Sequence, residues 1–190
     1  MKLNDLLKNN RSYRSFYEAK KIDENIAFEI LDAQKYAARG VNSQKLRYTL
    51  VLNEEKVNKI TSFSRWAGKI PNDEGRPKEG HRPVMYIIVY SDKKAYSEID
   101  EGIAINCIRL KAIEKNIGSC IVKSFNKENV NSLVENHEGF EISTVIAFGY
   151  PDHKSEIVET DNIDTKYFRD ENGNYTVERI STEKISYVEL

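Results

Sequence analysis

Residues 98–125, EIDEGIAINCIRLKAIEKNIGSCIVKSF, decide the fold class of this chain. Within 98–116, apolar side chains recur at spacings that cover nearly the whole circumference of a helix, which is typical of a helix buried on most sides. These side chains are Ile99, Ile103, Cys107, Ile108, Leu110 and Ala112. Gly118 stands where a helix end favours glycine, and 119–125 follows as a strand. The stretch predicts a long central helix that leads directly into a sheet.

The remaining elements follow from periodicity and from turn residues. A helix is expected at 23–38 with Asp23 as its N-cap, a short helix at 126–136, and strands at 46–53, 83–91 and 140–151. Residues 166–180 have the pattern of a hairpin about Gly173. Residues 65–82 are dense in Gly, Pro and charge, which favours a mobile loop or lid. Helices interleaved with buried strands predict one three-layer α+β or α/β domain.

Composition excludes several classes of function. The chain has 190 residues, enough for one well-packed domain, and 39% of them are apolar, too many for a disordered chain. The 29 basic and 30 acidic residues leave a formal net charge of −1, so no overall field favours nucleic acid or an anionic membrane. Any anion site must therefore be local.

The chain lacks the apolar region of a signal peptide and any apolar run near the roughly 20 residues of a membrane span. We therefore expect a cytoplasmic protein with no membrane partner. Cys107 and Cys120 are too few for a disulfide framework and are expected to be ordinary thiols.

Familiar catalytic motifs are absent. His81, His137 and His153 have no ligands at metal-binding spacing, so no metal site is expected. GRPKEGHR at 75–82 has the glycine spacing of a phosphate loop but lacks its Lys-Ser/Thr ending. Neither a G-x-G-x-x-G strand turn nor a G-x-S-x-G elbow occurs, and Cys107 is more typical of a core residue than of a nucleophile.

The segment NRSYRSF at 10–16 is a candidate anion site. Guanidinium groups bind phosphate bidentately and a serine hydroxyl adds a hydrogen bond, so Arg11, Ser12 and Arg14 could hold one terminal phosphate. The alternative is that both arginines lie on the surface and pair with Glu18 or Asp23.

The segment RGVNSQKLRY at 39–48 joins the first long helix to the first strand. Asn42 and Gln44 carry amides that donate and accept at once, which suits the edge of a heteroaromatic ring. The alternative is an ordinary turn whose amides bond to the backbone.

Taken together and in order, four segments resemble the nitroreductase family of flavin mononucleotide (FMN) enzymes. They are NRSYRSF, AARGVNSQKLRY, DEGIAINCIRLKAIEKNIGSCIVKSF and VIAFGYP, and they cover the chain almost end to end. The resemblance implies a three-layer α/β/α sandwich with a mostly antiparallel sheet and a long buried helix. It also implies a domain-swapped homodimer, with a dimer-contacting extension at 152–190 and FMN at the subunit interface.

The resemblance further assigns residues to the cofactor. Arg11, Ser12 and Arg14 would hold the phosphate and ribityl chain, and Asn42 and Gln44 would approach the ring from the partner subunit. The backbone N–H groups of Lys123 and Ser124 would face flavin N5. A basic residue near the C-terminus would complete the phosphate site, with Arg179 as the best match and then Lys166 and Arg169.

The implied activity is hydride transfer from NADH or NADPH, through FMN, to a nitroaromatic, a quinone or a similar small-molecule acceptor. No side chain acts as a catalytic acid or base, because the cofactor carries the reaction and the protein supplies position and charge. Arg14 would supply positive charge near flavin N1 and O2. Trp66, in the loop at 65–82, would either cover the site or pack against the dimer partner.

The chain departs from the family pattern at four positions. Asn10 stands where many members carry arginine, Arg39 replaces a small residue, Lys45 replaces proline, and Ser124 replaces a frequent glycine. Arg39 could narrow the substrate cleft. Two alternatives to the reductase therefore remain: a non-catalytic or partner-dependent FMN-binding protein, and a flavin enzyme for another reaction such as dehalogenation.

Overall fold

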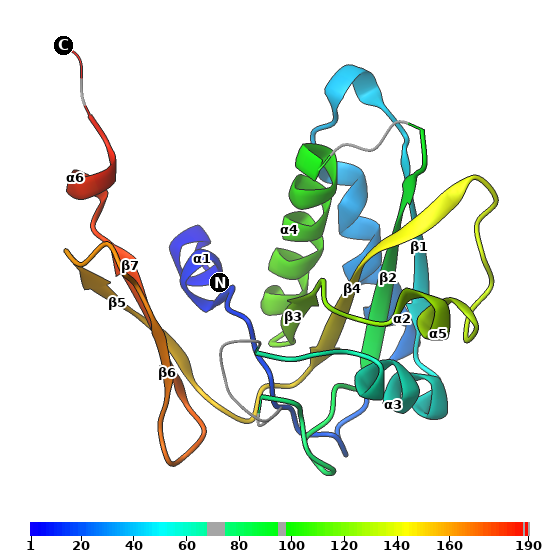
Figure 1. Cartoon of the computed structure of the whole chain (residues 1–190), viewed down its shortest axis with the longest axis horizontal. Helices are drawn as coiled ribbons and strands as arrows, with labels where there is room; N and C mark the ends of the chain where they lie inside the picture. The colour runs from blue at the N-terminus through cyan, green and yellow to red at the C-terminus, as the bar shows by residue number, and fades with distance from the viewer. Residues whose placement is uncertain (68–74, 95–97, 188, 190) are drawn as a thin grey trace.

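The computed structural model describes residues 1–67, 75–94, 98–187 and 189. Figure 1 shows a four-stranded sheet with helices on both faces, and a three-stranded sheet near the C-terminus that stands to one side. In chain order the elements are α1 (Leu3–Asn9), α2 (Glu24–Asp32), 3-10 turns at Ala33–Tyr36 and Gly40–Asn42, β1 (Leu46–Val51), α3 (Glu54–Ser62), β2 (Met85–Asp92), α4 (Glu98–Glu114), β3 (Gly118–Val122), α5 (Lys127–Asn131), β4 (Phe140–Gly149), β5 (Ser155–Thr160), β6 (Tyr167–Arg169), β7 (Tyr175–Ile180) and α6 (Thr182–Ile185).

The four-stranded sheet has the order β1-β2-β4-β3, and each neighbouring pair is antiparallel. Successive side chains of a strand point to opposite faces. On β2, Tyr86 and Ile88 therefore pack in a cluster with α3 and α5, whereas Met85 and Ile87 pack in a second cluster with α2 and α4. The predicted three-layer α+β domain around an antiparallel sheet is confirmed.

The predicted starts of the helices at 23 and 126 and the predicted strands are also confirmed. The Asp23 carboxylate accepts a hydrogen bond from the Asn25 backbone N–H at 2.9 Å and caps α2, and Asn126 caps α5 in the same way through Asn129. The strands lie within a few residues of their predicted bounds. However, α2 ends at Asp32 and continues only as a 3-10 turn, and α5 ends at Asn131 rather than at 136.

Helix α4 is buried along one side only. Its apolar spacing predicted burial nearly all round, and Ala104 and Ile108 do lie fully buried against the sheet. Ile99 and Ile103, on the opposite side, are exposed in the single chain. The prediction of a helix buried nearly all round is therefore wrong for this side.

The C-terminal sheet has the order β5-β7-β6. Strands β6 and β7 form the predicted hairpin, and Gly173 has φ +82° in the turn between them, a conformation that glycine adopts without strain. Strand β5 pairs in parallel with β7, which local patterns did not predict. Helices α1 and α3 were not predicted either.

Candidate functional site

The segment at 11–16 is fixed by two aromatic anchors. Tyr13 and Phe16 are buried, and the Tyr13 backbone N–H donates to the Ser119 carbonyl at 2.9 Å. A Cβ atom on Gly118 would lie 2.6 Å from the Tyr13 ring, and one on Gly149 would lie 2.8 Å from Phe16. These glycines therefore allow the segment to cross the ends of β3 and β4, while Arg11, Ser12 and Arg14 remain half-buried.

Three arginines from different parts of the chain meet beside this segment. Arg109, on α4, donates from Nε to the Ser119 hydroxyl and from Nη2 to the Arg11 carbonyl, both at 3.0 Å. Burial lowers the pKa of Arg11, and the charge of Arg179, on β7, lowers it further. Burial likewise lowers the pKa of Arg109, and the Arg11 charge acts in the same direction.

This arginine cluster, defined as Arg11, Arg109 and Arg179, has the properties of an anion site. Like charges at short range repel, so the cluster is stabilised when an anion lies among them. Within the described part of the chain, the buried Nε of Arg11 has no hydrogen-bond partner. Glu18 contacts Arg82 and Asp23 caps α2, so the acidic partners considered as the alternative are engaged elsewhere.

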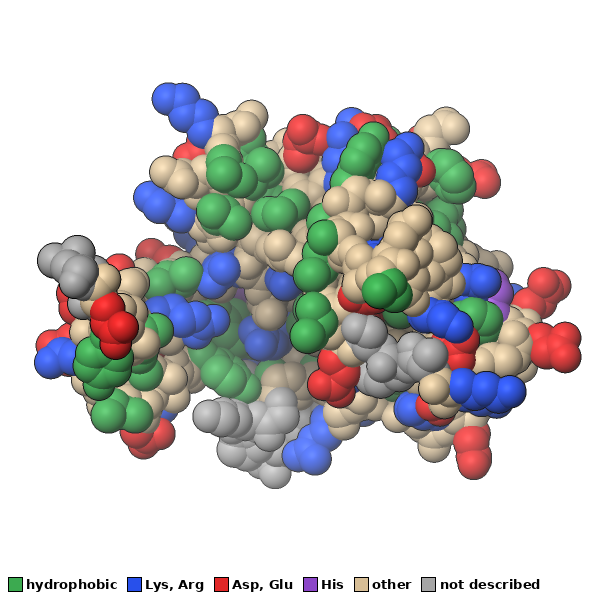
Figure 2. Space-filling view, turned by 90° about the horizontal axis from the view of Figure 1, so that it is seen from above, with side chains coloured by type: hydrophobic (Ala, Val, Ile, Leu, Met, Phe, Trp, Pro, Cys, Tyr) green, Lys and Arg blue, Asp and Glu red, His purple; other side chains and the backbone are tan. Residues whose placement is uncertain are grey.

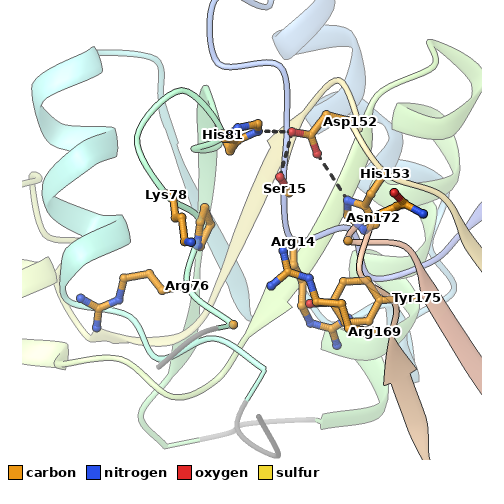
Figure 3. A pocket seen from close by; sticks show the side chains of 13 residues that line it. Arg14, Ser15, Arg76, Lys78, His81, Asp152, His153, Arg169, Asn172 and Tyr175 are labelled. Carbon is orange, nitrogen blue, oxygen red and sulfur yellow. Dashed lines mark hydrogen bonds and ion pairs between the residues drawn. The ribbon is translucent and has the colours of Figure 1, made fainter. Parts of the chain in front are cut away.

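The Arg14 side chain lies against the rings of Tyr167 and Tyr175. Its Cζ lies 5.0 Å from the centre of the Tyr175 ring and 5.3 Å from that of Tyr167, within the range of a cation–π interaction. A cavity of about 290 Å³ opens beside it, lined by the segment at 75–81 and by the β6–β7 hairpin. Figure 3 shows Arg14 next to Arg169 and Tyr175, with Lys78 across the cavity and Arg76 directed away from them.

Asp152 organises one wall of this cavity. Its carboxylate accepts a hydrogen bond from the Ser15 hydroxyl at 2.8 Å and contacts His81, while His153 Nδ1 lies 3.5 Å away (Figure 3). Burial acts to raise the pKa of Asp152, but the Ser15 hydrogen bond and His81 outweigh it, so the pKa is lowered. Burial lowers the pKa of His153, against the opposing effect of Asp152.

Lys123 and Ser124 follow the last residue pair of the β3–β4 ladder, Val122 with Val145. Lys123 Nζ lies 3.1 Å from the Thr144 hydroxyl and 3.8 Å from Oε1 of Glu101. Glu101, on α4, is only 3% exposed and accepts a hydrogen bond from Thr144. A buried carboxylate therefore lies beneath the strand end where the ring of a flavin was expected.

Asn42 and Gln44 lie far from the arginines in the single chain. Figure 1 places the turn at 39–45 beyond the N-terminal end of α4, whereas the segment at 11–16 runs near the other end of that helix. The Gln44 amide donates to Asn42, and Arg39 donates to the side chains of Gln44 and Gln34. The turn's polar groups thus bond to one another, and Arg39 is held against its own chain.

Trp66 is 2% exposed and belongs to the apolar cluster under α3 and α5. Both roles suggested by the sequence, covering the site and packing against a partner, are therefore wrong, because the chain's own core already encloses the ring. Part of the predicted lid, residues 68–74, lies outside the described residues. Residues 75–82 do not form a phosphate loop, because they lead into β2 rather than a helix.

Sequence patterns missed two residues of this region. Arg109 and Glu101 are charged residues within α4, near apolar residues that were expected to be buried, and that placement was the available signal. Lys166 bonds through its backbone N–H to Glu178, and Arg169 lies in the cavity with Arg14, so only Arg179 of the three C-terminal candidates joins Arg11.

The described residues contain no group of three or more His, Cys, Asp or Glu side chains that could hold a metal ion. None of their helices is long and apolar enough to cross a membrane.

The family model described as the Nitroreductase family matches residues 7–150, more than half of the chain. The chain belongs to the nitroreductase family. The matched range includes the segment at 11–16, the turn at 39–45 and all of α4, so it contains most of the residues considered above. No curated protein matches the sequence significantly.

Solved nitroreductase structures share this fold at low sequence identity. An FMN-dependent nitroreductase from Clostridium difficile R20291 has a TM-score of 0.65 and 18% identity, over 85% of this chain and 95% of that one. A nitroreductase with bound FMN from Bacteroides fragilis NCTC 9343 has a TM-score of 0.61 and 22% identity, over 80% and 89%. A nitroreductase family protein from Clostridium novyi NT has a TM-score of 0.65 and 18% identity, over 80% and 86%.

Proposed function

We propose that this protein is an FMN-dependent oxidoreductase that passes hydride from NADH or NADPH to a small-molecule acceptor such as a nitroaromatic or a quinone. The observation that carries the proposal is the arginine cluster, because Arg109 donates to the Arg11 carbonyl and the charge of Arg179 lowers the pKa of Arg11 where the family motif begins. Membership of the family and the FMN named for two structural neighbours support the same reading.

The residues present fit the phosphate end of FMN. Arg11 has a buried, unpartnered Nε among the described residues, and the charge of Arg179, on β7, lowers the pKa of Arg11. Ser12 pairs with Ser119 through the backbone, and we assign its hydroxyl to the same phosphate. A phosphate here would neutralise like charges that otherwise repel, with charge-assisted hydrogen bonds that are about twice as strong as neutral ones.

The residues near the strand end would position the ring. We assign the backbone N–H groups of Lys123 and Ser124 to flavin N5, and Arg14 to the region of N1 and O2. When bound, FMN supplies the chemistry itself, by accepting hydride from the nicotinamide and passing it to the acceptor. The protein orients the reactants, holds positive charge near the ring and excludes water.

We propose a homodimer that completes each site. Asn42 and Gln44 lie near the opposite end of α4 from Arg11 (Figure 1), and we assign them to the cofactor bound by the partner subunit. The exposed apolar side of α4 and exposed Val158 and Phe168 of the C-terminal sheet supply surface for such contact. The segment at 152–190 would be the extension that contacts the partner. Burial of this surface would stabilise the dimer by the hydrophobic effect.

A visible absorption spectrum tests the proposed function directly. The purified protein, supplied with FMN, should show a flavin band that NADH or NADPH bleaches without oxygen and that a nitro compound restores. A protein that binds no FMN contradicts the proposal. A flavin band that neither nicotinamide bleaches favours the FMN-binding protein, and turnover of a halogenated phenol favours the dehalogenase. A monomer that keeps stoichiometric FMN during sedimentation contradicts the shared site.

A further inference from the structure

Glu101, in the first turn of α4, is a buried charge to which the proposed reaction gives no role; it is 3% exposed. Its Oε1 accepts a hydrogen bond from the Thr144 hydroxyl, on β4, whereas the buried Oε2 has no hydrogen-bond partner among the described residues. Burial raises the pKa of nearby Tyr48 to about 12, and the charge of Glu101 acts in the same direction, against that of Arg39. A buried carboxylate with so few donors depends on a positive charge close to it.

Lys123 supplies that positive charge. Its Nζ lies 3.8 Å from Oε1 of Glu101 and donates a hydrogen bond at 3.1 Å to the Thr144 hydroxyl, which in turn donates to Glu101. The Glu101 side chain is 4% exposed and that of Lys123 is 59% exposed, so the ammonium group reaches inward from the surface. Lys123 directly follows β3, which ends at Val122. The three side chains therefore connect the end of β3 to β4 and α4.

The end of β3 is where the proposed function places the reactive edge of FMN, and this inference rests on that proposal. The backbone N–H groups of Lys123 and Ser124 are assigned there to flavin N5, so the pair of Lys123 and Glu101 would lie close to the ring. Charges near this edge tune the electronics of a flavin. Figure 2 shows Lys and Arg side chains along the hollow between the C-terminal sheet and the rest of the molecule, and Glu101 adds a charge of the opposite sign beneath the strand end.

We propose that Glu101 is a positioning residue for the flavin edge, which acts through Thr144 and Lys123. It holds the Lys123 ammonium inward and so fixes both the strand end and the position of one positive charge beside N5. Without the carboxylate, the long lysine side chain would extend into solvent, because one hydrogen bond to Thr144 offers little gain over water. Reduced FMN carries more negative charge than the oxidised form, so the buried carboxylate lowers the reduction potential and the ammonium raises it.

Urea denaturation of the FMN-free protein tests the pairing without any cofactor. Lys123→Gln leaves Glu101 buried without its cation, so the equilibrium constant for unfolding should rise. The rise should be at least about threefold smaller when Glu101→Gln is also present, because contacting residues are coupled. Lys127 and Glu141 form the matched control, since their charged atoms lie 3.7 Å apart but both side chains are more than half exposed, so Gln substitutions there should be additive. Additive effects at Glu101 and Lys123 would overturn the proposal.

The reduction potential of the FMN-loaded protein, measured by equilibration with a dye of known potential, tests the effect on the flavin. Glu101→Gln should raise the potential, because a buried charge is screened less than an exposed one, and Lys123→Gln should lower it. Each shift should be about 30 mV, which corresponds to a tenfold change in the equilibrium of a two-electron couple. Glu101→Asp keeps the charge and should stay closer to the parent protein than Glu101→Gln does. Lys127→Gln should leave the potential unchanged.

Opposite shifts distinguish a positioning role from a purely structural one, because loosening of the fold alone would not change sign with the charge that is removed. Shifts of the same sign, or no shift in either variant, overturn this inference while the proposed function stands. A protein that binds no FMN overturns the proposed function and this role together, and the coupling between Glu101 and Lys123 during unfolding would still be observed.

Discussion

From Met85 to Tyr90 every residue of β2 is buried, whereas in β5, β6 and β7 only Tyr175 is buried. The first sheet is covered by helices on both faces, so its own chain supplies its stability. The C-terminal sheet lies against the rest of the molecule through few apolar contacts and leaves Ile157, Val158 and Phe168 exposed. The difference indicates that packing within the chain stabilises the first sheet, whereas the C-terminal sheet keeps apolar surface exposed in the single chain.

The largest effect is expected in the covered sheet. Phe148, in β4, is 0% exposed, so Phe148→Ala removes buried apolar surface and leaves a cavity. The free energy of unfolding should fall by about 3–5 kcal/mol. Urea denaturation followed by circular dichroism measures the loss. A loss below about 1 kcal/mol would show that the helices on the two faces do not hold this sheet as the packing indicates.

The next effect concerns the arginines between the two sheets. Arg11→Ala and Arg14→Ala should each weaken FMN binding by about 1.5–3 kcal/mol, because each removes a charge-assisted hydrogen bond. Quenching of flavin fluorescence on titration with the FMN-free protein gives the dissociation constants. Lys127→Ala is the control for loss of a cation elsewhere. Unchanged affinity in both arginine variants would contradict the assignment of Arg11 to the phosphate and of Arg14 to the flavin ring.

The third effect is a dependence of the free energy of unfolding on pH, which His153 is expected to cause. His153 is 2% exposed in its side chain, and burial lowers its pKa below the unfolded value of about 6.5. At a pH between the folded and the unfolded pKa of His153, the unfolded chain binds a proton that the folded chain does not. The free energy of unfolding should therefore fall as the pH drops below about 7. Asp152, whose pKa is also lowered, adds its own loss only below about pH 4.

The substitution His153→Phe isolates this effect, because it keeps a ring between Tyr13 and Tyr175 but cannot titrate. The parent protein should lose stability from pH 7 to pH 5 more steeply than the variant, in urea denaturation at each pH. Equal slopes would show that His153 is not buried in its neutral form.

The smallest effect on folding is expected in the C-terminal sheet. Phe168 is 51% exposed, so Phe168→Ala should change the free energy of unfolding of the monomer by less than about 0.5 kcal/mol. If the proposed dimer covers this strand, sedimentation should show that the Phe168→Ala variant dimerises more weakly than the parent protein. A large loss of monomer stability would mean that this sheet is part of the folding core, and the comparison between the sheets would fail.

Helix caps and strands were predictable because their causes are local. Asp23 and Asn126 cap helices from the position beside the first turn, and the apolar run in β2 is the pattern of a strand covered on both faces. Arg11, Ser12 and Arg14, the residues proposed to bind the cofactor, were found from a short motif. The burial of Trp66 was missed because nothing near it in sequence indicates what covers it.

By itself, the sequence determined the alternation of helices with buried strands and the position of the candidate anion segment, since these depend on spacing and on neighbouring residues. The antiparallel sheet was expected only from the family resemblance, and the anchoring of Tyr13 and Phe16 came from the tertiary structure. Only the tertiary structure decided that Arg109 and Arg179 join Arg11, that Glu101 is buried beneath Lys123, and that Arg169 faces Arg14. The reason is physical. Burial and the interaction of charges depend on which distant segments meet, and Arg109 contacts Arg11 across 98 residues of chain.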